Sequence, residues 1–221
     1  MAFTDAVFDG KAQLEGVIAK HARTISSLKA MLQCRRAVAV ATDELNDLVD
    51  AIRPDILVDA RMRKRQHPEK QRGLARLTIG LGPNFIAGDT TDLVIETAWG
   101  PSLGQIIKHG PSLPLSGEPK AIGGHERDRF VYSEVAGKFL TEMEIGDAVT
   151  RGQAVGRIGD AVLKAPLTGR LRGLTHSGVW VNKGSKVIEV DVRGDAAVVR
   201  GLGERPARIA AGVLAAIQEA A

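Results

Sequence analysis

Short apolar runs alternate with helix-like segments through the first half of the chain. The apolar runs lie at residues 37–41, 55–59, 77–81 and 93–97. Each has the length and the continuous apolar character of a buried strand. Apolar residues at helical spacing follow the candidate caps Thr24 or Ser26, and they follow Thr42 or Asp43 again before Pro54 ends the pattern. Continuous apolar strands with helices between them predict a parallel α/β sheet.

The second half contains an internal repeat of 32 residues. The glycines and valines that recur in phase are Gly146, Val149, Gly152 and Val155, followed by Gly178, Val181, Gly184 and Val187. A further segment, residues 137–139, recurs at 169–171. Glycine-marked turns without helical periodicity predict two similar units of short strands. Because neither unit can bury its apolar face alone, we expect the two to pack together as a small sandwich.

Glycine and proline concentrate between the two halves, in residues 110–125, which we interpret as a connector. Near the C-terminus, Ile209, Val213 and Ile217 lie on one face of a predicted helix, with small residues between them that allow close packing. The predicted organisation is an α/β domain at 1–109, a connector at 110–125, a β domain at 126–196 and a helical tail at 197–221.

The composition, with 44% hydrophobic and 25% charged residues, is that of an ordinary globular protein. No apolar run is long enough to span a membrane, and the N-terminus lacks the pattern of a secretory signal. The single Cys34 cannot form an internal disulfide, which favours the reducing cytoplasm. Aromatic residues make up only 4%, which argues against base stacking with nucleic acid. We therefore expect a cytoplasmic protein that binds neither membrane nor nucleic acid.

Positive charge is concentrated in residues 61–76. This segment contains seven Lys or Arg residues and one acid, Glu69, for a net charge of +6, whereas the whole chain carries +4. Two interpretations of this patch stay open. It is either a solvated loop or a surface that contacts a phosphate or an acidic partner.

Candidate ligand-binding residues gather at the expected carboxyl ends of the strands, where ligands bind in open parallel sheets. Asp59 can accept a hydroxyl hydrogen, and Arg61 or Lys64 can hold a phosphate. A glycine-containing turn after the third strand can bring backbone N–H groups to an anion. The alternative is an ion pair at the loop mouth, with Phe85 packed as a plug over a tight turn. The predicted rim consists of Asp59, Arg61, Lys64, Gly80, Gly82, Asn84 and Glu96.

Neither a catalytic constellation nor a metal site is predicted. The five histidines lack metal-ligand spacing, and the sequence has no nucleophile elbow. His125 follows two glycines in the connector and has the best case for a functional role among the histidines, with a surface or hinge role as the alternative. Cys34 precedes Arg35 and Arg36, and we interpret it as a half-buried thiol at a helix end.

Residues 145–155 and 165–169 resemble the barrel-sandwich hybrid of biotinyl and lipoyl carrier domains. Carrier domains present a modified lysine on the hairpin between their two halves. Here that hairpin, residues 159–163, contains no lysine, and Lys164 directly precedes Ala165 in the next strand. The resemblance therefore implies a carrier-like fold without the carrier function.

Seven segments carry a second resemblance, at residues 3–19, 53–65, 79–107, 117–124, 146–160, 165–174 and 212–217. They resemble the YqeB family, which comprises accessory proteins found with selenium-dependent molybdenum hydroxylases. The resemblance implies a non-catalytic accessory or maturation protein whose client is a molybdenum hydroxylase of the xanthine-dehydrogenase type. The alternative is an enzyme or cofactor-binding subunit of a biosynthetic pathway, which holds a nucleotide- or pterin-like anion at the rim.

Family members carry a strand and a dinucleotide-type glycine turn before the segment that matches residues 3–6, where this chain starts. No G-x-G-x-x-G motif follows a strand here. We therefore expect a truncated Rossmann-like sheet, followed by a barrel-sandwich hybrid and a C-terminal helix. A sheet without its first strand exposes an edge, so we expect a homo-oligomer or a partner protein to cover it.

Overall fold

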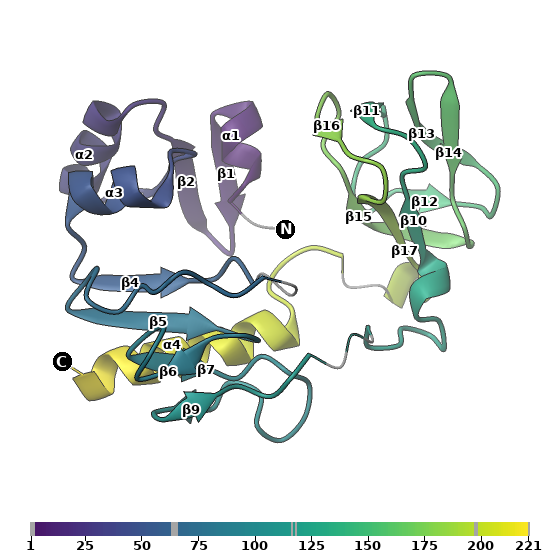
Figure 1. Cartoon of the computed structure of the whole chain (residues 1–221). Coiled ribbons are helices and arrows are strands. Elements are labelled where there is room, and N and C mark those ends of the chain that lie inside the picture. Colours follow the sequence, from purple (N-terminus) through teal and green to yellow (C-terminus); the bar gives the residue numbers. More distant parts are fainter. Residues whose placement is uncertain (1–2, 63–65, 116, 118, 197–198, 221) are drawn as a thin grey trace. The chain divides into compact units, whose positions relative to one another are not determined.

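The computed structural model describes residues 3–62, 66–115, 117, 119–196 and 199–220. The chain forms two compact units (Figure 1). One unit comprises residues 1–116 together with 202–221, and the other comprises residues 117–201. Among the described residues, no helix is long and apolar enough to cross a membrane.

A three-stranded sheet of order β1-β2-β3 begins the first unit, with β1 antiparallel and β3 parallel to β2. Its strands are β1 (Lys11–Leu14), β2 (Val17–His21) and β3 (Val38–Val40). The accompanying helices are α1 (Asp5–Asp9), α2 (Ile25–Cys34) and α3 (Leu45–Ile52). Because α2 connects the two parallel strands, this region is a β-α-β unit.

The two predicted helices form, but only one begins at a predicted cap. Thr24 caps α2, where its side chain accepts a hydrogen bond from the backbone N–H of Ser27 and the Ser27 side chain completes a capping box. The N-cap of α3 is Glu44, without a side-chain cap bond, so the predicted cap at Thr42 or Asp43 is wrong. The apolar face of α3 fixes where the helix lies, and tertiary packing therefore outweighs the cap preference.

A second sheet, of order β4-β5-β7-β8, carries the predicted rim. Its strands are β4 (Ile56–Asp59), β5 (Leu77–Leu81), β7 (Leu93–Ile95) and β8 (Ile106–Ile107). β4, β5 and β7 are parallel, as the sequence predicts, and β8 is antiparallel to β7. The expectation that residues 37–41 join this sheet is wrong, because β3 pairs with β2. No helix separates β4, β5 and β7 within the described residues.

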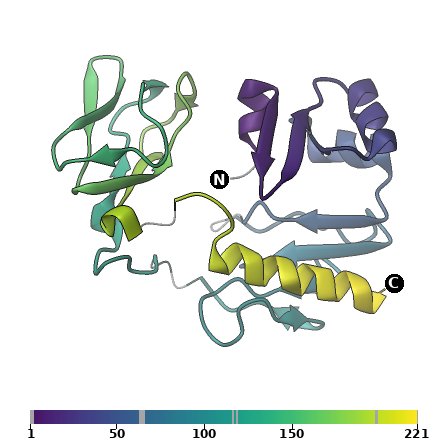
Figure 2. The same ribbon diagram turned by 180° about the vertical axis from the view of Figure 1, so that it is seen from behind.

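Helix α4 (Glu204–Ala220) lies across one face of this second sheet (Figure 2). Ile209 and Ala216 are buried among residues of the sheet, and Val213 and Ile217 pack beside them. The helix approaches closely at Gly212, where a Cβ atom would lie 2.1 Å from the carbonyl oxygen of Gly104. The predicted C-terminal helix is confirmed, and it belongs to the first unit although the second unit precedes it in the sequence.

A two-stranded pairing extends the first unit beyond the main sheet. β6 (Ile86–Ala87) pairs antiparallel with β9 (Gly110–Pro111). Phe85, Ala87 and Val94 form a small core beside it. The start of the predicted connector is thus hydrogen-bonded to the first unit.

The second unit consists of two four-stranded antiparallel sheets, of order β10-β17-β15-β12 and β14-β13-β11-β16. Its strands are β10 (Phe130–Tyr132), β11 (Gly137–Leu140), β12 (Ala148–Val149), β13 (Ala154–Ile158), β14 (Ala161–Lys164), β15 (Gly169–Leu174), β16 (Trp180–Val181) and β17 (Lys186–Asp191). Short 3-10 helices lie at Arg127–Arg129 and Gly194–Ala196. Neither strand order closes into a barrel.

The pairing register reproduces the 32-residue repeat. Gly137 pairs with Val181, and their counterparts across the repeat, Gly169 and Val149, pair in the same way. The repeat matches β10 with β14, β11 with β15, β12 with β16 and β13 with β17. Exchanging matched strands turns the strand order of one sheet into that of the other. Each sheet takes two strands from each repeat, so neither repeat forms its sheet alone. The predicted repeat is confirmed.

The recurring glycines occupy the same turn in both repeats. Gly146 and Gly178 have φ values of +104° and +90°, which glycine adopts without steric cost. The N–H of Gly146 donates to the carbonyl of Leu171 at 2.8 Å, and the N–H of Gly178 donates to the carbonyl of Phe139 at 2.7 Å. The repeat in the sequence is therefore a repeat of backbone conformation.

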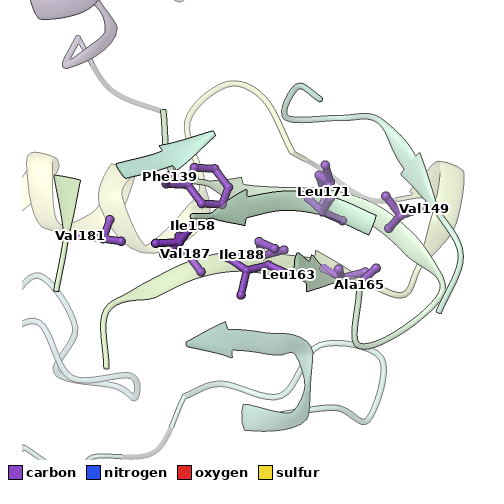
Figure 3. Close-up of a cluster of buried hydrophobic side chains, with 11 residues drawn as sticks. Phe139, Val149, Ile158, Leu163, Ala165, Leu171, Val181, Val187 and Ile188 are labelled. Atoms are coloured by element: carbon purple, nitrogen blue, oxygen red, sulfur yellow. The ribbon is translucent and has the colours of Figure 1, made fainter. Parts of the chain in front are cut away.

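Both sheets contribute to one hydrophobic core (Figure 3). Phe139 and Leu171, which correspond across the repeat, are both fully buried. Val149 and Val181, which also correspond, close the core at their ends of β12 and β16. This shared burial is the physical reason that the two repeats pack together.

Candidate functional site

Strand pairing brings the predicted rim residues to one edge of the second sheet. Asp59, the last residue of β4, pairs with Gly80 of β5, and Gly80 pairs with Val94 of β7. Glu96 follows the end of β7. The expected convergence of the strand ends therefore occurs.

The carboxylate of Asp59 is held by two neighbours. It is 5% exposed and accepts hydrogen bonds from the backbone N–H and the guanidinium of Arg61, at 2.5–3.1 Å. It also accepts a 2.5 Å hydrogen bond from Nε2 of Gln71. A second oxygen, from Glu69, contacts the Arg61 guanidinium at 2.6 Å. This geometry matches the ion pair at the loop mouth, the alternative to a ligand site.

The electrostatics of this pair follow from the contacts. Burial opposes ionisation of Asp59, but hydrogen bonds from Arg61 and Gln71 outweigh it, so the pKa of Asp59 lies below its ordinary value. The hydrogen bond to Asp59 raises the pKa of Arg61, which stays charged. Both groups are therefore ionised near neutral pH, and neither is poised to exchange a proton.

Glu96 holds a backbone turn together. Its side chain is 3% exposed, and Oε1 accepts hydrogen bonds from the N–H groups of Thr97 and Ala98, both at 2.7 Å. Its other oxygen accepts a bond from the N–H of Leu113, also at 2.7 Å. A buried carboxylate that accepts hydrogen bonds from three backbone N–H groups has a structural role.

The glycine turn after β5 is filled by side chains of the same chain. A Cβ atom on Gly80 would lie 2.3 Å from Cγ of Phe85, which is 2% exposed. Gly82 has a φ of +87° and faces Thr97, and its carbonyl accepts a 2.8 Å hydrogen bond from Ser112. Asn84 adopts a φ of +74°. Phe85 thus packs as a plug against this turn.

Six of the seven rim residues are described, and Lys64 lies outside the described residues. Asp59 and Arg61 bind each other. The sequence analysis missed three further partners, namely Gln71 of Asp59, Thr97 of Glu96 and Ser112 of Gly82. These residues share no motif. Only the burial of a polar residue such as Gln71, at 0% exposure, marks its role, and burial is not visible in one sequence.

A cavity of about 370 Å³ lies where β2 and β3 of the first sheet begin. It is lined by Gly16, Val17, Ile18, Arg35, Arg36, Ala37 and Val38. No acidic partner of either arginine side chain is found among the described residues. Arg35 adopts a φ of +53° at the end of α2, a position that usually favours glycine. Its lining residues include two arginines and two valines, a combination suited to an anion with an apolar part.

The remaining candidates occupy half-buried or exposed positions. Nδ1 of His125 lies 2.5 Å from Asp128, and hydrogen bonding to this histidine lowers the pKa of Asp128. Cys34 is exposed. Lys164 ends β14 opposite Ala154, at the far end of the hairpin from its turn. Within the described residues, no group of three or more His, Cys, Asp or Glu side chains is arranged to hold a metal ion.

The fold and these contacts define a protein with one α/β unit and one β unit built from an internal repeat. Over 218 residues, 98% of this chain, it is 38% identical to the uncharacterized protein YqeB of Escherichia coli strain K12. The chain spans 40% of the length of that relative. This similarity supports the YqeB family label that the sequence motifs suggest.

No protein-family model matches the chain. Among solved structures, it is similar to the product-bound structure of the ectoine utilization protein EutE (DoeB) from Ruegeria pomeroyi. The two are 26% identical, with a TM-score of 0.27, and the match covers 29% of this chain and 22% of that one.

Proposed function

We propose that this chain is a non-catalytic accessory protein that assists maturation of a molybdenum hydroxylase of the xanthine-dehydrogenase type in the cytoplasm. The similarity to YqeB along 98% of the chain supports an accessory role. The single observation that carries the non-catalytic part is the state of the rim, where Asp59, Arg61 and Glu96 are bound to groups of their own chain.

In this proposal the two units have different folds. The first is a Rossmann-like domain whose parallel strands β4, β5 and β7 end at the rim. The second is a barrel-sandwich hybrid of the biotinyl and lipoyl type, supported by the swapped strands of its two repeats. The hairpin between the repeats turns at Gly159 and Asp160 and presents no lysine there, which supports a carrier-like fold put to structural use.

Deletion of the gene tests this function directly. In the deletion strain we expect the client hydroxylase to accumulate with low activity and low molybdenum content, and a plasmid copy should restore both. A tagged chain should co-purify with the immature hydroxylase. Normal molybdenum content and activity in the deletion strain would contradict an accessory role.

A second candidate function is binding of a nucleotide- or pterin-like anion, as part of an enzyme or cofactor-binding subunit. The arginine cavity favours it, because its volume falls in the range of small-molecule sites and two arginines are among its lining residues. The rim is the other candidate place, supported by the basic segment 61–76 and the strand ends that meet there.

Separate variants distinguish these two places. Calorimetric titration with GTP and with pyrophosphate should detect binding of the anion. If the cavity holds the anion, the double variant Arg35→Ala and Arg36→Ala removes this binding. Lys64→Ala removes it if the rim does. Lys29→Ala, on the exposed side of α2, is the control. Arg61→Ala is unsuitable alone, because it leaves the buried Asp59 without its main partner and should cost about 1–3 kcal/mol of stability.

A further inference from the structure

The outer face of the sheet β14-β13-β11-β16 combines one exposed aromatic ring with three cations. Alternation along each strand points Phe139, Ile158 and similar residues into the core and their neighbours outward. The outward residues of this face are Lys138 and Leu140 on β11, Arg157 on β13, Val162 and Lys164 on β14, and Trp180 on β16. Trp180 is 67% exposed and Val162 is 55% exposed.

Cross-strand pairing makes this face continuous. Lys138 lies opposite Trp180, so an ammonium group and an indole ring are neighbours across β11 and β16. Arg157 lies between Leu140 on one side and Val162 on the other. Aromatic, aliphatic and cationic groups therefore share one exposed surface, which we name the Trp180 face.

The internal repeat supplies a control surface within the same unit. The pairing of Phe130 with Glu189 corresponds to the pairing of Val162 with Arg157, so Arg157 occupies the position of Glu189. In the control sheet, Glu189 pairs with Arg129, with Arg172 at 3.3 Å and with Lys186 at 2.8 Å. The equivalent position on the Trp180 face carries the opposite charge.

The control sheet and the Trp180 face also differ in charge balance. Glu189 and Asp191 on β17 neutralise the cations of the control sheet, with Asp191 bound by Arg172 and Arg193. The four strands of the Trp180 face contain no Asp or Glu. Among the described residues, Lys138, Arg157 and Lys164 form no ion pair.

We propose that the Trp180 face docks an acidic surface of a partner protein, with Trp180 as its aromatic anchor. Tryptophan and arginine are the residues that most often dominate protein interfaces, and the three cations of this face complement carboxylates. A face that has a single aromatic ring and the aliphatic residues Leu140 and Val162 suits a protein surface better than a nucleic acid, which needs several stacking platforms. This inference rests on the proposed accessory function, since it specifies the surface through which an accessory protein meets its partner.

The test uses Trp180 as its own reporter. Trp99→Phe leaves Trp180 as the only tryptophan of the full chain, and poly-L-glutamate serves as the acidic polypeptide probe. We expect it to change Trp180 fluorescence saturably and in a salt-dependent manner. The triple variant K138E, R157E and K164E should weaken this response about tenfold or more, since it reverses all three charges that would pair with carboxylates. The matched triple K11E, K20E and K29E changes the net charge equally and should leave it unchanged.

Three results would overturn the proposal. The first is a Trp180 that acrylamide cannot quench in the free chain, because the face would then be covered already. The second is an equal loss of response in the two triple variants. The third is a stronger response to an oligothymidylate or to phosphatidylserine vesicles than to polyglutamate at equal charge, which would assign the face to a nucleic acid or a membrane.

The outcomes also separate this inference from the accessory function. A client that co-purifies equally well with the wild-type chain and with the K138E, R157E and K164E variant would overturn the docking face and leave the accessory role intact. A deletion strain with normal hydroxylase, combined with a polyglutamate response confined to Trp180, would support the face while the accessory role fails.

Discussion

Single residues at the rim act in one of two ways. They leave space for a neighbouring side chain, or they accept hydrogen bonds from backbone donors. Gly80 matters because its missing side chain makes room for the ring of Phe85. Glu96 matters because its two oxygens satisfy three backbone donors. The rim residues described therefore pack against, or form hydrogen bonds with, other groups of the chain at the ends of three strands.

We expect Gly80→Ala to destabilise the first unit by about 1–3 kcal/mol, because the added methyl group meets the ring of a buried Phe85. Urea denaturation would measure the change. Since φ at Gly80 is not positive, backbone strain does not confuse the result. Combining the change with Phe85→Leu should recover part of the loss, and strictly additive effects of the two substitutions would contradict this packing explanation.

Elements of the second unit are built around equivalent positions in two repeats. Gly137 and Gly169 occupy the same register position, and both bring a strand close to its neighbour. The neighbours differ, however. A Cβ atom on Gly137 would meet the side chain of Ile158 at 2.7 Å, whereas one on Gly169 would meet the backbone oxygen of Asp191 at 2.2 Å.

This difference predicts unequal effects from an equal change. Gly169→Ala should lower the melting temperature more than Gly137→Ala, because a backbone oxygen in a paired strand cannot move aside as a side-chain methyl can. Gly137 also has a φ of +156°, which adds some strain to its own variant. Thermal unfolding followed by circular dichroism would rank the two, and the reverse order would show that the repeats are less alike than their registers.

The charged pairs on β17 predict acid sensitivity of the second unit. A hydrogen bond from Arg193 lowers the pKa of Asp191 below its ordinary value of 3.8, even though burial opposes ionisation. A carboxylate with a lowered pKa stabilises the folded state above its ordinary pKa, and this stabilisation disappears as the pH falls through the folded-state value. The free energy of unfolding should therefore fall as the pH decreases below about 4.

Asp191→Asn isolates this contribution. The variant should be less stable than the wild type near neutral pH, and the difference should shrink as the solution is acidified. Denaturant titrations at a series of pH values would follow the gap between the two proteins. A gap that stays constant down to strongly acidic pH would mean that the ion pairs of Asp191 do not account for the stability it provides.

The whole molecule leaves apolar strands at the edges of its sheets. β4, with Ile56, Leu57 and Val58, is an edge strand of the second sheet, and β3 is an edge strand of the first, where Val38 is 40% exposed. Neither strand contains the lysine or proline that commonly protects an edge. Such edges favour pairing with another chain.

We therefore expect light scattering on the purified chain to report a mass well above 23.5 kDa, or a complex with a partner protein. Val38→Lys should reduce the association if the β3 edge forms the contact, because a charged side chain there blocks edge pairing. Leu214→Lys, at an exposed position on α4, is the control. A stable monomer at high concentration would contradict this expectation.

Much of the architecture follows from the sequence because the relevant forces are local or periodic. The apolar spacing behind Thr24 places α2, and the stripe of Ile209, Val213 and Ile217 places the packing face of α4. The 32-residue recurrence of glycine and valine predicts the paired repeats, since each glycine supplies a conformation that the same turn needs twice. Strand period and turn conformation are properties of a few consecutive residues.

Only the tertiary structure decided which strands become neighbours and what the polar residues contact. The pattern of residues 37–41 fits either sheet equally well, and β3 joins β2 because pairing depends on the path of the whole chain. Asp59 looks like a ligand-binding residue in the sequence, but Arg61 and the distant Gln71 occupy its oxygens. The charge of the Trp180 face likewise emerges only when four separated strands are assembled, because hydrogen bonds and charge balance are settled between residues far apart in the chain.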